Sequence, residues 1–390
     1  MIEVRDSETI RRRLGGREDL RPTGSAVDCF HRSAVEALTR RVGIDADKPV
    51  SAEARDLENA TLLDLAGQSL RLQGHNPATM PPADRAEMAL MASDPMNSPG
   101  SFPNVLSAAA NKIAERPADD AAVTFRQWSY RARKSPPDFK PTTVLHIGEF
   151  AEFPEHIDGH PFEQSTFNVE TNWFQIGSYG DEFALTPRMI VDDDLDIFAD
   201  SIEDKATAHD LTLQRLCVEL LTKNVTLPDT YPLFHTAQHG NDLAAGAAPA
   251  EAQLTAIRQL LRQQQGVSQQ RVMGYDLFGI LIPSQLETNA EKILSDLHVV
   301  PAVAANAEIY RGRVRYWTEP MLDGYSTAVW YGFADPQRAR AIVHAHQQGF
   351  EKMKLRQYVD PRTTSLTWQC EGRFAAAVRN YRGVVRNPGA

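Results

Sequence analysis

The spacing of apolar residues predicts helices along the first 140 residues. Apolar side chains recur every three or four positions over Ser25–Val42, over roughly Ser51–Gln73 and over Pro103–Glu115. None of these helices is apolar enough to be stable alone, so we expect them to pack on another part of this chain or on a neighbouring chain. Residues 75–103 contain six prolines, which exclude one continuous helix and predict an extended arm.

The longest helical pattern covers Asp194–Asn224 and carries its large apolar residues on one stripe. Such a helix would be ~45 Å long, enough to brace a whole subunit. Its start carries four aspartates, Asp192, Asp193, Asp194 and Asp196. We interpret them as capping residues, because the positive end of a helix dipole favours carboxylates; a divalent-metal site is the alternative.

Residues 233–335 predict a second lobe of mixed type. The expected elements are a helix at 250–265 and strands at 277–282, Arg313–Trp317 and Thr327–Phe333. Between the first two strands, Ser284 followed by Glu287 predicts a capping box that opens another helix.

Residues 141–187 combine acidic and aromatic side chains. They contain eight Asp and Glu residues and no Lys or Arg, so their formal charge is −8. Extended patterns on both sides of Asp158-Gly159, a common turn sequence, predict a long two-stranded ribbon. Because an isolated hairpin is only marginally stable in water, the ribbon needs a docking surface, either on its own domain or on a neighbouring subunit.

The C-terminal residues 337–390 have the opposite charge. Ten Lys and Arg residues against three acidic residues give a formal charge of +7. Ala341–Ala345, Leu366–Glu371 and Ala375–Val385 are expected to be extended. Basic strands of one chain could therefore receive the acidic ribbon of the next, although exposed ion pairs contribute only ~0–1 kcal/mol each.

Composition narrows the class of protein. The 390 residues suffice for two to three domains at ~150 residues each. A hydrophobic content of 42% excludes wholesale disorder, and no apolar run reaches the ~18 residues of a membrane-spanning helix. We expect no secretory signal at the start, and the three scattered cysteines, Cys29, Cys217 and Cys370, fit reduced thiols. The net charge of −10 argues against a surface that coats nucleic acid.

Catalytic motifs are missing from the sequence. We find no phosphate-binding glycine loop, nucleophile elbow, HExxH, CxxC or dinucleotide fingerprint, so we expect no enzyme, cofactor or metal site. His235 and His239 have the spacing of two metal ligands on a helix, but Gly240 predicts a loop there. A metallohydrolase that uses these two histidines with Asp192 and Asp193 is the enzyme alternative.

Six stretches form a distinctive set in chain order. They are PGSFPNVL, PDFK, SYGDEFALTPRMIVDDDLDIF, YPLFHTAQHGNDLAAGAA, LFGILIPSQLETNAEKIL and the terminal YRGVVRNPGA. Together they resemble the major capsid proteins of tailed bacteriophages, particularly the Mu-like head proteins. The resemblance spans about residues 60–390.

The resemblance implies an α+β fold of the Hong Kong 97 type, with a peripheral domain, an axial domain, an extended β-hairpin loop and an N-terminal arm. The peripheral domain of that fold holds a long spine helix and an extended sheet. The implied parts are a helical, scaffolding-like segment at 1–60, an N-terminal arm and helix at 61–140, the extended loop at 141–187, the peripheral domain with the spine helix at 188–232, the axial domain at 233–335 and peripheral strands at 336–390.

The function that the resemblance implies is that of a head protein. Copies would self-assemble into hexamers and pentamers and form an icosahedral shell around double-stranded DNA, which is held without sequence specificity. The implied partners are further copies, a portal, a head protease or scaffold and, as a further candidate, a decoration protein, with no membrane. Assembly would occur in the bacterial host cytoplasm, and the product is the virion capsid.

Two other readings keep a shell or head role. An encapsulin-like nanocompartment has the same fold, and a minor head or decoration protein is a third reading.

Some members of the fold link their subunits through a lysine on the extended loop. Residues 141–187 contain no lysine, and the nearest is Lys140, so we expect a noncovalent shell.

The opposite charges of the loop and the C-terminal strands suggest where two subunits meet. The residues that we expect at this contact are Glu152, Glu155 and Glu163 on the loop and Arg373, Arg379 and Arg382 on the basic strands of a neighbour.

Overall fold

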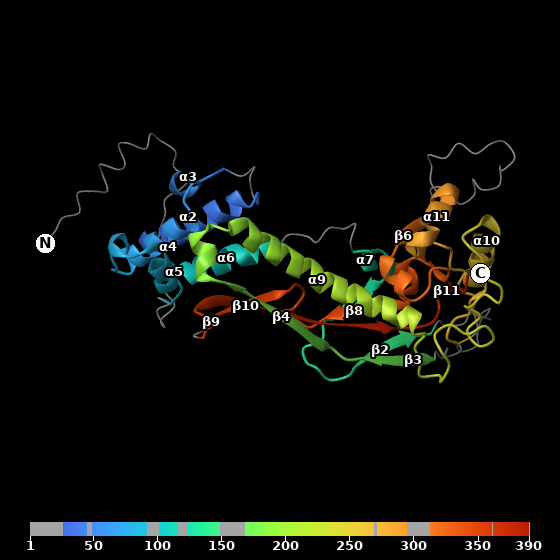
Figure 1. Cartoon of the computed structure of the whole chain (residues 1–390). Helices are drawn as coiled ribbons and strands as arrows, with labels where there is room; N and C mark the ends of the chain where they lie inside the picture. Colours follow the sequence, from blue (N-terminus) through green and yellow to red (C-terminus); the bar gives the residue numbers. More distant parts are fainter. Residues whose placement is uncertain are drawn as a thin grey trace, which may run out of the picture. The chain divides into compact units, whose positions relative to one another are not determined.

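The computed structural model describes residues 26–44, 49–91, 101–115, 123–148, 168–268, 271–294, 313–360 and 362–389 (Figure 1). The chain divides into two compact units, each assembled from separate stretches of sequence. The first unit takes Met1–Arg116, Glu182–Ile202 and Leu355–Gln369, and the second takes the remaining residues. Helices and strands are both present, which confirms the mixed α and β class.

The first unit is built mainly from helices. These are α2 (Ala26–Arg41), α3 (Ala52–Leu57), α4 (Leu62–Leu72), α5 (Pro82–Met91), α6 (Phe102–Ala114) and α8 (Pro187–Val191), with a 3-10 turn η1 (Pro77–Thr79). Leu38, Leu62, Phe102, Phe198 and Trp368 are buried in one shared core. The N-terminal helices therefore pack within their own chain, one of the two expectations from the sequence.

The predicted helix at Ser51–Gln73 is wrong as a single element, because the chain breaks into α3 and α4. Thr61 starts the second helix: its hydroxyl accepts from the backbone N–H of Asp64, and the Asp64 carboxylate accepts from the N–H of Thr61. This reciprocal capping box satisfies backbone donors that a continuous helix would have paired internally.

The extended arm predicted at 75–103 is also wrong over part of its length. Pro77 and Pro82 each stand at the first position of a helical turn, in η1 and α5. Proline is favoured there because its missing N–H would have no partner inside the helix. The prolines thus start these helices, and α5 runs on to Met91.

The aspartates before the long helix are mostly committed elsewhere. Asp193 has a left-handed backbone (φ 57°), and its carboxylate accepts from the backbone N–H of Leu62 at 2.7 Å and from Arg41 at 2.8 Å. It therefore caps α4 rather than the helix that follows it in the sequence. Asp192 pairs with Arg188, and Asp196 alone lies in the first turn of α9 (Leu195–Thr222).

The long helix and a five-stranded sheet both contain residues of the first and of the second unit. Helix α9 has 28 residues, so the helix predicted at Asp194–Asn224 is confirmed. The sheet has the order β1-β8-β10-β4, with β9 also paired to β10. Its strands are β1 (Tyr130–Arg131), β4 (Gly177–Leu185), β8 (Ile342–His346), β9 (Lys354–Asp360) and β10 (Ser365–Val378).

The second unit holds a further sheet in the order β11-β7-β5-β6. Its strands are β5 (Gly279–Ile282), β6 (Arg315–Thr318), β7 (Trp330–Phe333) and β11 (Val384–Asn387). The helical elements of this unit, besides part of α9, are α7 (Phe125–Trp128), α10 (Glu251–Gln263), η2 (Ser284–Leu286), α11 (Glu287–Leu294), η4 (Pro320–Gly324) and α12 (Pro336–Ala339). Ile257, Ile280 and Trp330 are fully buried between them.

Two local predictions in this unit are wrong. Ser284 does not open a capping box: the residue before η2 is Pro283, and the Ser284 N–H donates to the Asp323 carboxylate at 3.0 Å. The extended segment predicted at Ala375–Val385 is interrupted after Val378 by a turn that contains Gly383 at φ +85°. A side chain at Gly383 would collide with Ala339, since its Cβ would lie 2.3 Å from the Ala339 Cβ.

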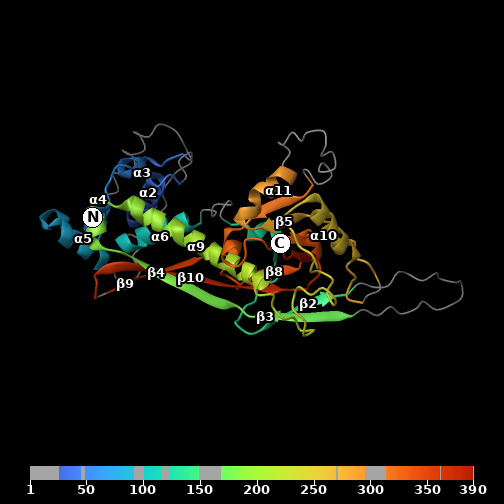
Figure 2. The same ribbon diagram turned by 45° about the vertical axis from the view of Figure 1, so that its right-hand side comes forward.

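The second strand of the ribbon predicted at 141–187 ends earlier than expected. Strand β2 (Thr142–Ile147) pairs antiparallel with β3 (Val169–Phe174), and the two lie side by side (Figures 1 and 2). The chain then leaves the ribbon, because β4 pairs with β10 in the five-stranded sheet. Ile147 pairs with Val169, so the sequence midpoint of their connection is residue 158, where the Asp-Gly turn is expected. That turn lies outside the described residues.

Candidate assembly interface

The β2–β3 ribbon has one covered and one open face. Phe174 on the covered face is buried with Ile176 and Ala375. On the opposite face Leu145 is 52% exposed, Val169 45% and Trp173 61%. Large apolar side chains gathered on one side of a two-stranded sheet are typical of a surface that another protein covers.

A buried arginine holds strand β3 of this ribbon. The Arg382 guanidinium holds both carboxylate oxygens of Glu170 on β3, at 2.7 and 3.1 Å, and its side chain is only 3% exposed. It also donates to the Tyr381 hydroxyl at 2.8 Å and to the Gln265 carbonyl at 2.6 Å. A bidentate arginine–carboxylate pair fixes direction as well as distance, so the ribbon is held in a defined orientation on the second unit.

A groove of about 440 Å³ lies beside strand β2 and the end of strand β3. We call it the basic groove, since its cationic lining residues are Arg133, Lys134, Arg340 and Arg379. Leu145 of β2 contributes to the same wall and accepts a hydrogen bond from Arg379 at its carbonyl, at 3.0 Å. Within the described residues, none of the four cations forms an ion pair with a carboxylate.

The charges of the basic groove therefore repel one another. Burial lowers the pKa of Arg379, and the positive charges of Arg340 and Arg133 lower it further. Its Nε is buried and has no hydrogen-bond partner among the described residues. Arg340 lies over the Tyr130 ring at 4.8 Å, which holds its guanidinium in place. A carboxylate brought into this groove would gain both Coulomb energy and a hydrogen-bond donor.

The three arginines expected at the subunit contact have different surroundings. Arg379 alone lines the basic groove. Arg373 donates to Gln347 at 3.1 Å and lies over the Phe350 ring at 4.1 Å, so its charge is engaged within the chain. Arg382 is committed to Glu170, as described above. Glu152, Glu155 and Glu163 lie outside the described residues, and their contact with a neighbour stays a prediction.

Sequence reasoning missed the groove residues Arg133 and Lys134, and it counted Arg340 among the basic C-terminal residues without placing it at the contact. The run RARK at 131–134 was the available signal for two of them. The pairing of β1 with β8 brings this run near Arg340, since Tyr130 stands opposite Val343. Acidic residues of the ribbon region also find cations in their own chain, as Glu170 does with Arg382 and Asp181 with Lys205. This agrees with docking on its own domain, one of the two alternatives that the sequence left open.

The alternative metal site is not assembled by the residues that suggested it. His239 lies in a loop, with Nδ1 3.0 Å from the Leu233 carbonyl and Nε2 2.7 Å from the Asp229 carboxylate. The neighbouring His235 Nδ1 accepts from the backbone N–H of Gln238. Over the described part of the chain, no three His, Cys, Asp or Glu side chains gather as metal ligands would.

The helices that the structure describes include none with the length and apolar character needed to cross a membrane.

Comparison with known proteins gives one family and a set of solved structures. The family model described as phage capsid protein matches residues 169–387, more than half of the chain. No curated protein matches this chain. The capsid of Myoviridae phage XM1 is 13% identical with a TM-score of 0.42, and the match covers 68% of this chain and 91% of that one. For Mycobacterium phage Patience these values are 15%, 0.42, 72% and 88%. For a virus-like particle from Pyrococcus furiosus they are 12%, 0.41, 71% and 97%.

Proposed function

The chain belongs to the phage capsid protein family and is a major capsid protein that forms the shell, and we propose that it does so as a Hong Kong 97-type subunit arranged in hexamers and pentamers. The family match over residues 169–387 carries this proposal, and it favours a phage shell over an encapsulin-like compartment. Head-to-tail contacts between identical copies close into rings when the rotation permits. Rings of two sizes can share one subunit through small hinge adjustments.

In this proposal the parts of the chain take the roles of that fold. The assigned ranges are 1–60 for a scaffolding-like segment, 61–140 for the N-terminal arm and helix, 141–187 for the extended loop, 188–232 and 336–390 for the peripheral domain and 233–335 for the axial domain. The proposed partners are further copies, a portal, a head protease or scaffold, a decoration protein and packaged double-stranded DNA. A net charge of −10 suits a container that encloses DNA without binding it tightly.

We propose that the acidic loop of one subunit docks in the basic groove of the next. Residues 149–167 contain five acidic residues and no Lys or Arg, and the groove has four cations with no carboxylate partner among the described residues. The open ribbon face, with Leu145, Val169 and Trp173, adds apolar area to the same contact. Each contact is modest, but a subunit held by several neighbours rebinds before it escapes.

Charge reversal of the loop tests this docking. We expect the triple variant Glu152→Lys, Glu155→Lys and Glu163→Lys to fold but to form few closed shells, because like charges then meet across the contact. Negative-stain electron microscopy and sedimentation of the full chain measure shell yield. Adding Arg379→Glu and Arg340→Glu should restore part of that yield.

A second triple variant separates the contact from net charge. Glu53→Lys, Glu287→Lys and Glu291→Lys change the formal charge equally at exposed positions of α3 and α11, and we expect normal shells. Normal shells from the loop variant at physiological salt would refute the docking. If both triple variants form equally few shells, the change in net charge causes the loss and not the contact. Absence of shells from the unaltered chain would refute the assembly proposal itself.

A further inference from the structure

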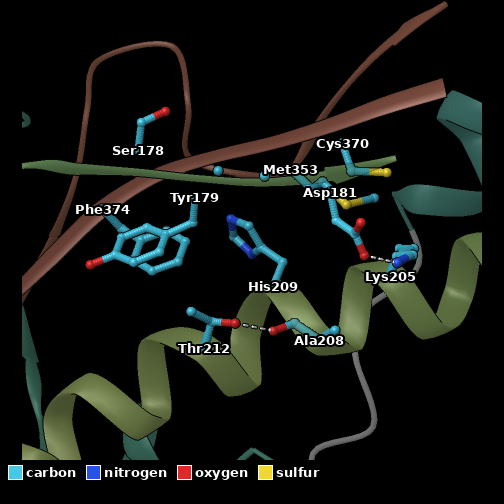
Figure 3. Close-up of a pocket in the computed structure, with 12 residues that line it drawn as sticks. Ser178, Tyr179, Asp181, Lys205, Ala208, His209, Thr212, Met353, Cys370 and Phe374 are labelled. Carbon is cyan, nitrogen blue, oxygen red and sulfur yellow. Dashed lines mark hydrogen bonds and ion pairs between the residues drawn. The ribbon is translucent and has the colours of Figure 1, made fainter. Parts of the chain in front are cut away.

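The second unit contains a cavity that the proposed assembly does not use. It has a volume of about 470 Å³ and lies between helix α9 and the strands β4 and β10 (Figure 3). Tyr179 of β4 and Phe374 of β10 stack there with ring centroids 4.6 Å apart and planes 9° apart. Met353 lines the wall beyond His209, and His209 projects from α9 toward the strands between them (Figure 3). Small-molecule sites of this volume typically combine aromatic walls with a few placed polar groups, and the polar side chains of this lining are Ser178, Asp181, Lys205, His209 and Thr212.

The tautomer of the neutral form of His209 follows from its neighbour. Its Nδ1 lies 3.1 Å from an oxygen of the Asp210 carboxylate. Burial alone would raise the pKa of Asp210, but the hydrogen bond with His209 and the charge of Arg126 outweigh burial and lower it. Asp210 is therefore ionised and can only accept, so Nδ1 carries the hydrogen. In the neutral ring Nε2 is then a hydrogen-bond acceptor.

That acceptor has no partner among the described residues. The His209 side chain is 7% exposed, and Nε2 is buried without a hydrogen bond. Among the other polar side chains of the lining, the Thr212 hydroxyl donates to the Ala208 carbonyl, and Lys205 pairs with Asp181 (Figure 3). The Ser178 hydroxyl donates to the Glu371 carboxylate at 3.2 Å. Buried polar atoms are rarely left unpaired in native proteins, so an unpaired acceptor in a cavity wall indicates a missing donor.

A glycine lets the imidazole take this position. A Cβ on Gly372 would lie 2.4 Å from the His209 Cδ2 and 2.7 Å from Nε2, closer than any real contact. The strand therefore has no side chain where the ring edge approaches β10. The cavity combines a stacked aromatic pair, an aliphatic sulfur side chain and one unpaired acceptor.

We propose that this cavity binds a small, uncharged, planar aromatic molecule that carries a single hydrogen-bond donor, of the phenol class. Its ring packs against the Tyr179–Phe374 pair, and its hydroxyl donates to Nε2 of His209. A charged ligand is disfavoured, because the two charged lining groups already neutralise each other as Lys205 and Asp181.

Phenol and toluene are a matched pair of probes for this site, because they have nearly the same shape and only phenol donates. Isothermal titration of the full chain should give saturable binding of both, with phenol bound about tenfold more tightly, the usual effect of one hydrogen bond. In His209→Phe, which keeps a ring and removes the acceptor, the preference for phenol should disappear. In His235→Phe, a histidine change outside the cavity lining, the tenfold ratio should persist.

A blocking variant tests the location independently. Ala208 is an exposed position on α9 that lines the cavity, and Ala208→Phe should abolish binding of both probes while the circular dichroism spectrum stays unchanged. Absence of saturable binding by the unaltered chain would overturn the proposal, as would equal affinity for the two probes. Unchanged binding in Ala208→Phe would place the ligand elsewhere and overturn it as well. None of these measurements requires shell formation.

Discussion

Two buried histidines of β8 make the second unit sensitive to acid. Burial lowers the pKa of His344 to about 3, and the charges of His346 and Arg131 act in the same direction. Burial likewise lowers the pKa of His346 to about 4, with contributions from His209 and Arg131. The Nδ1 of His346 is buried and has no partner among the described residues, so protonating it brings no compensating hydrogen bond.

The sign of the resulting pH dependence is fixed by which state binds protons first. An unfolded histidine protonates near pH 6.5, whereas these folded ones stay neutral until much lower pH. Stability is therefore complete above about pH 6.5 and falls as the pH drops toward the folded values. Between pH 7.5 and 4.5, we expect the free energy of unfolding of His346→Phe to fall by about 2 kcal/mol less than that of the unaltered chain. Urea unfolding at both pH values measures this difference, and an equal loss in both proteins would contradict it.

At the scale of elements, the sequence predicts what is local and fails where a distant partner decides. Helix α9 is predictable because one apolar stripe repeats over its whole length. The role of Asp193 is not, because the donor it caps, the N–H of Leu62, is 131 residues away in the chain. The basic groove is hidden for the same reason: Arg133, Arg340 and Arg379 meet only because β1 pairs with β8 and β8 with β10.

The Arg382–Glu170 ion pair is one of the contacts that anchor the β2–β3 ribbon. Removing the Arg382 side chain leaves the Glu170 carboxylate without its partner, and we expect Arg382→Ala to destabilise the second unit by about 2–3 kcal/mol. The value lies below that of a fully buried pair, because Glu170 is 38% exposed. Denaturant unfolding measures the loss, and limited proteolysis should cut the β2–β3 ribbon faster.

Arg362→Ala is the matched control for this experiment. Arg362 is 89% exposed and lies 3.6 Å from Asp360, so its loss should cost less than about 0.5 kcal/mol. A similarly small effect of Arg382→Ala would show that the ribbon is held by its apolar contacts instead.

At the scale of the whole molecule, the N-terminal helices are part of the first unit's core. Ala34 and Leu38 of α2 are buried in the same cluster as Leu62 and Phe198. A scaffolding-like segment that extends to residue 60 could therefore not be removed without opening this core.

Two deletions distinguish the extent of any removable segment. Deleting residues 1–25 leaves every described helix in place, and we expect an unchanged thermal midpoint and normal shells. Deleting residues 1–60 removes α2 and α3, exposes the partners of Leu38 and should give insoluble or unfolded protein. Solubility, differential scanning calorimetry and electron microscopy of the two products give the answer. A soluble, folded product from the longer deletion would show that the first unit does not need these helices.

Strand β11 gives the second unit an order of events during synthesis. It pairs with β7, Arg386 holds Asp242 at 2.7 Å, and Asn387 is fully buried. The sheet therefore closes only after residues 384–387 have emerged from the ribosome. Without these residues β7 would present an unpaired edge, which is a template for pairing with another chain.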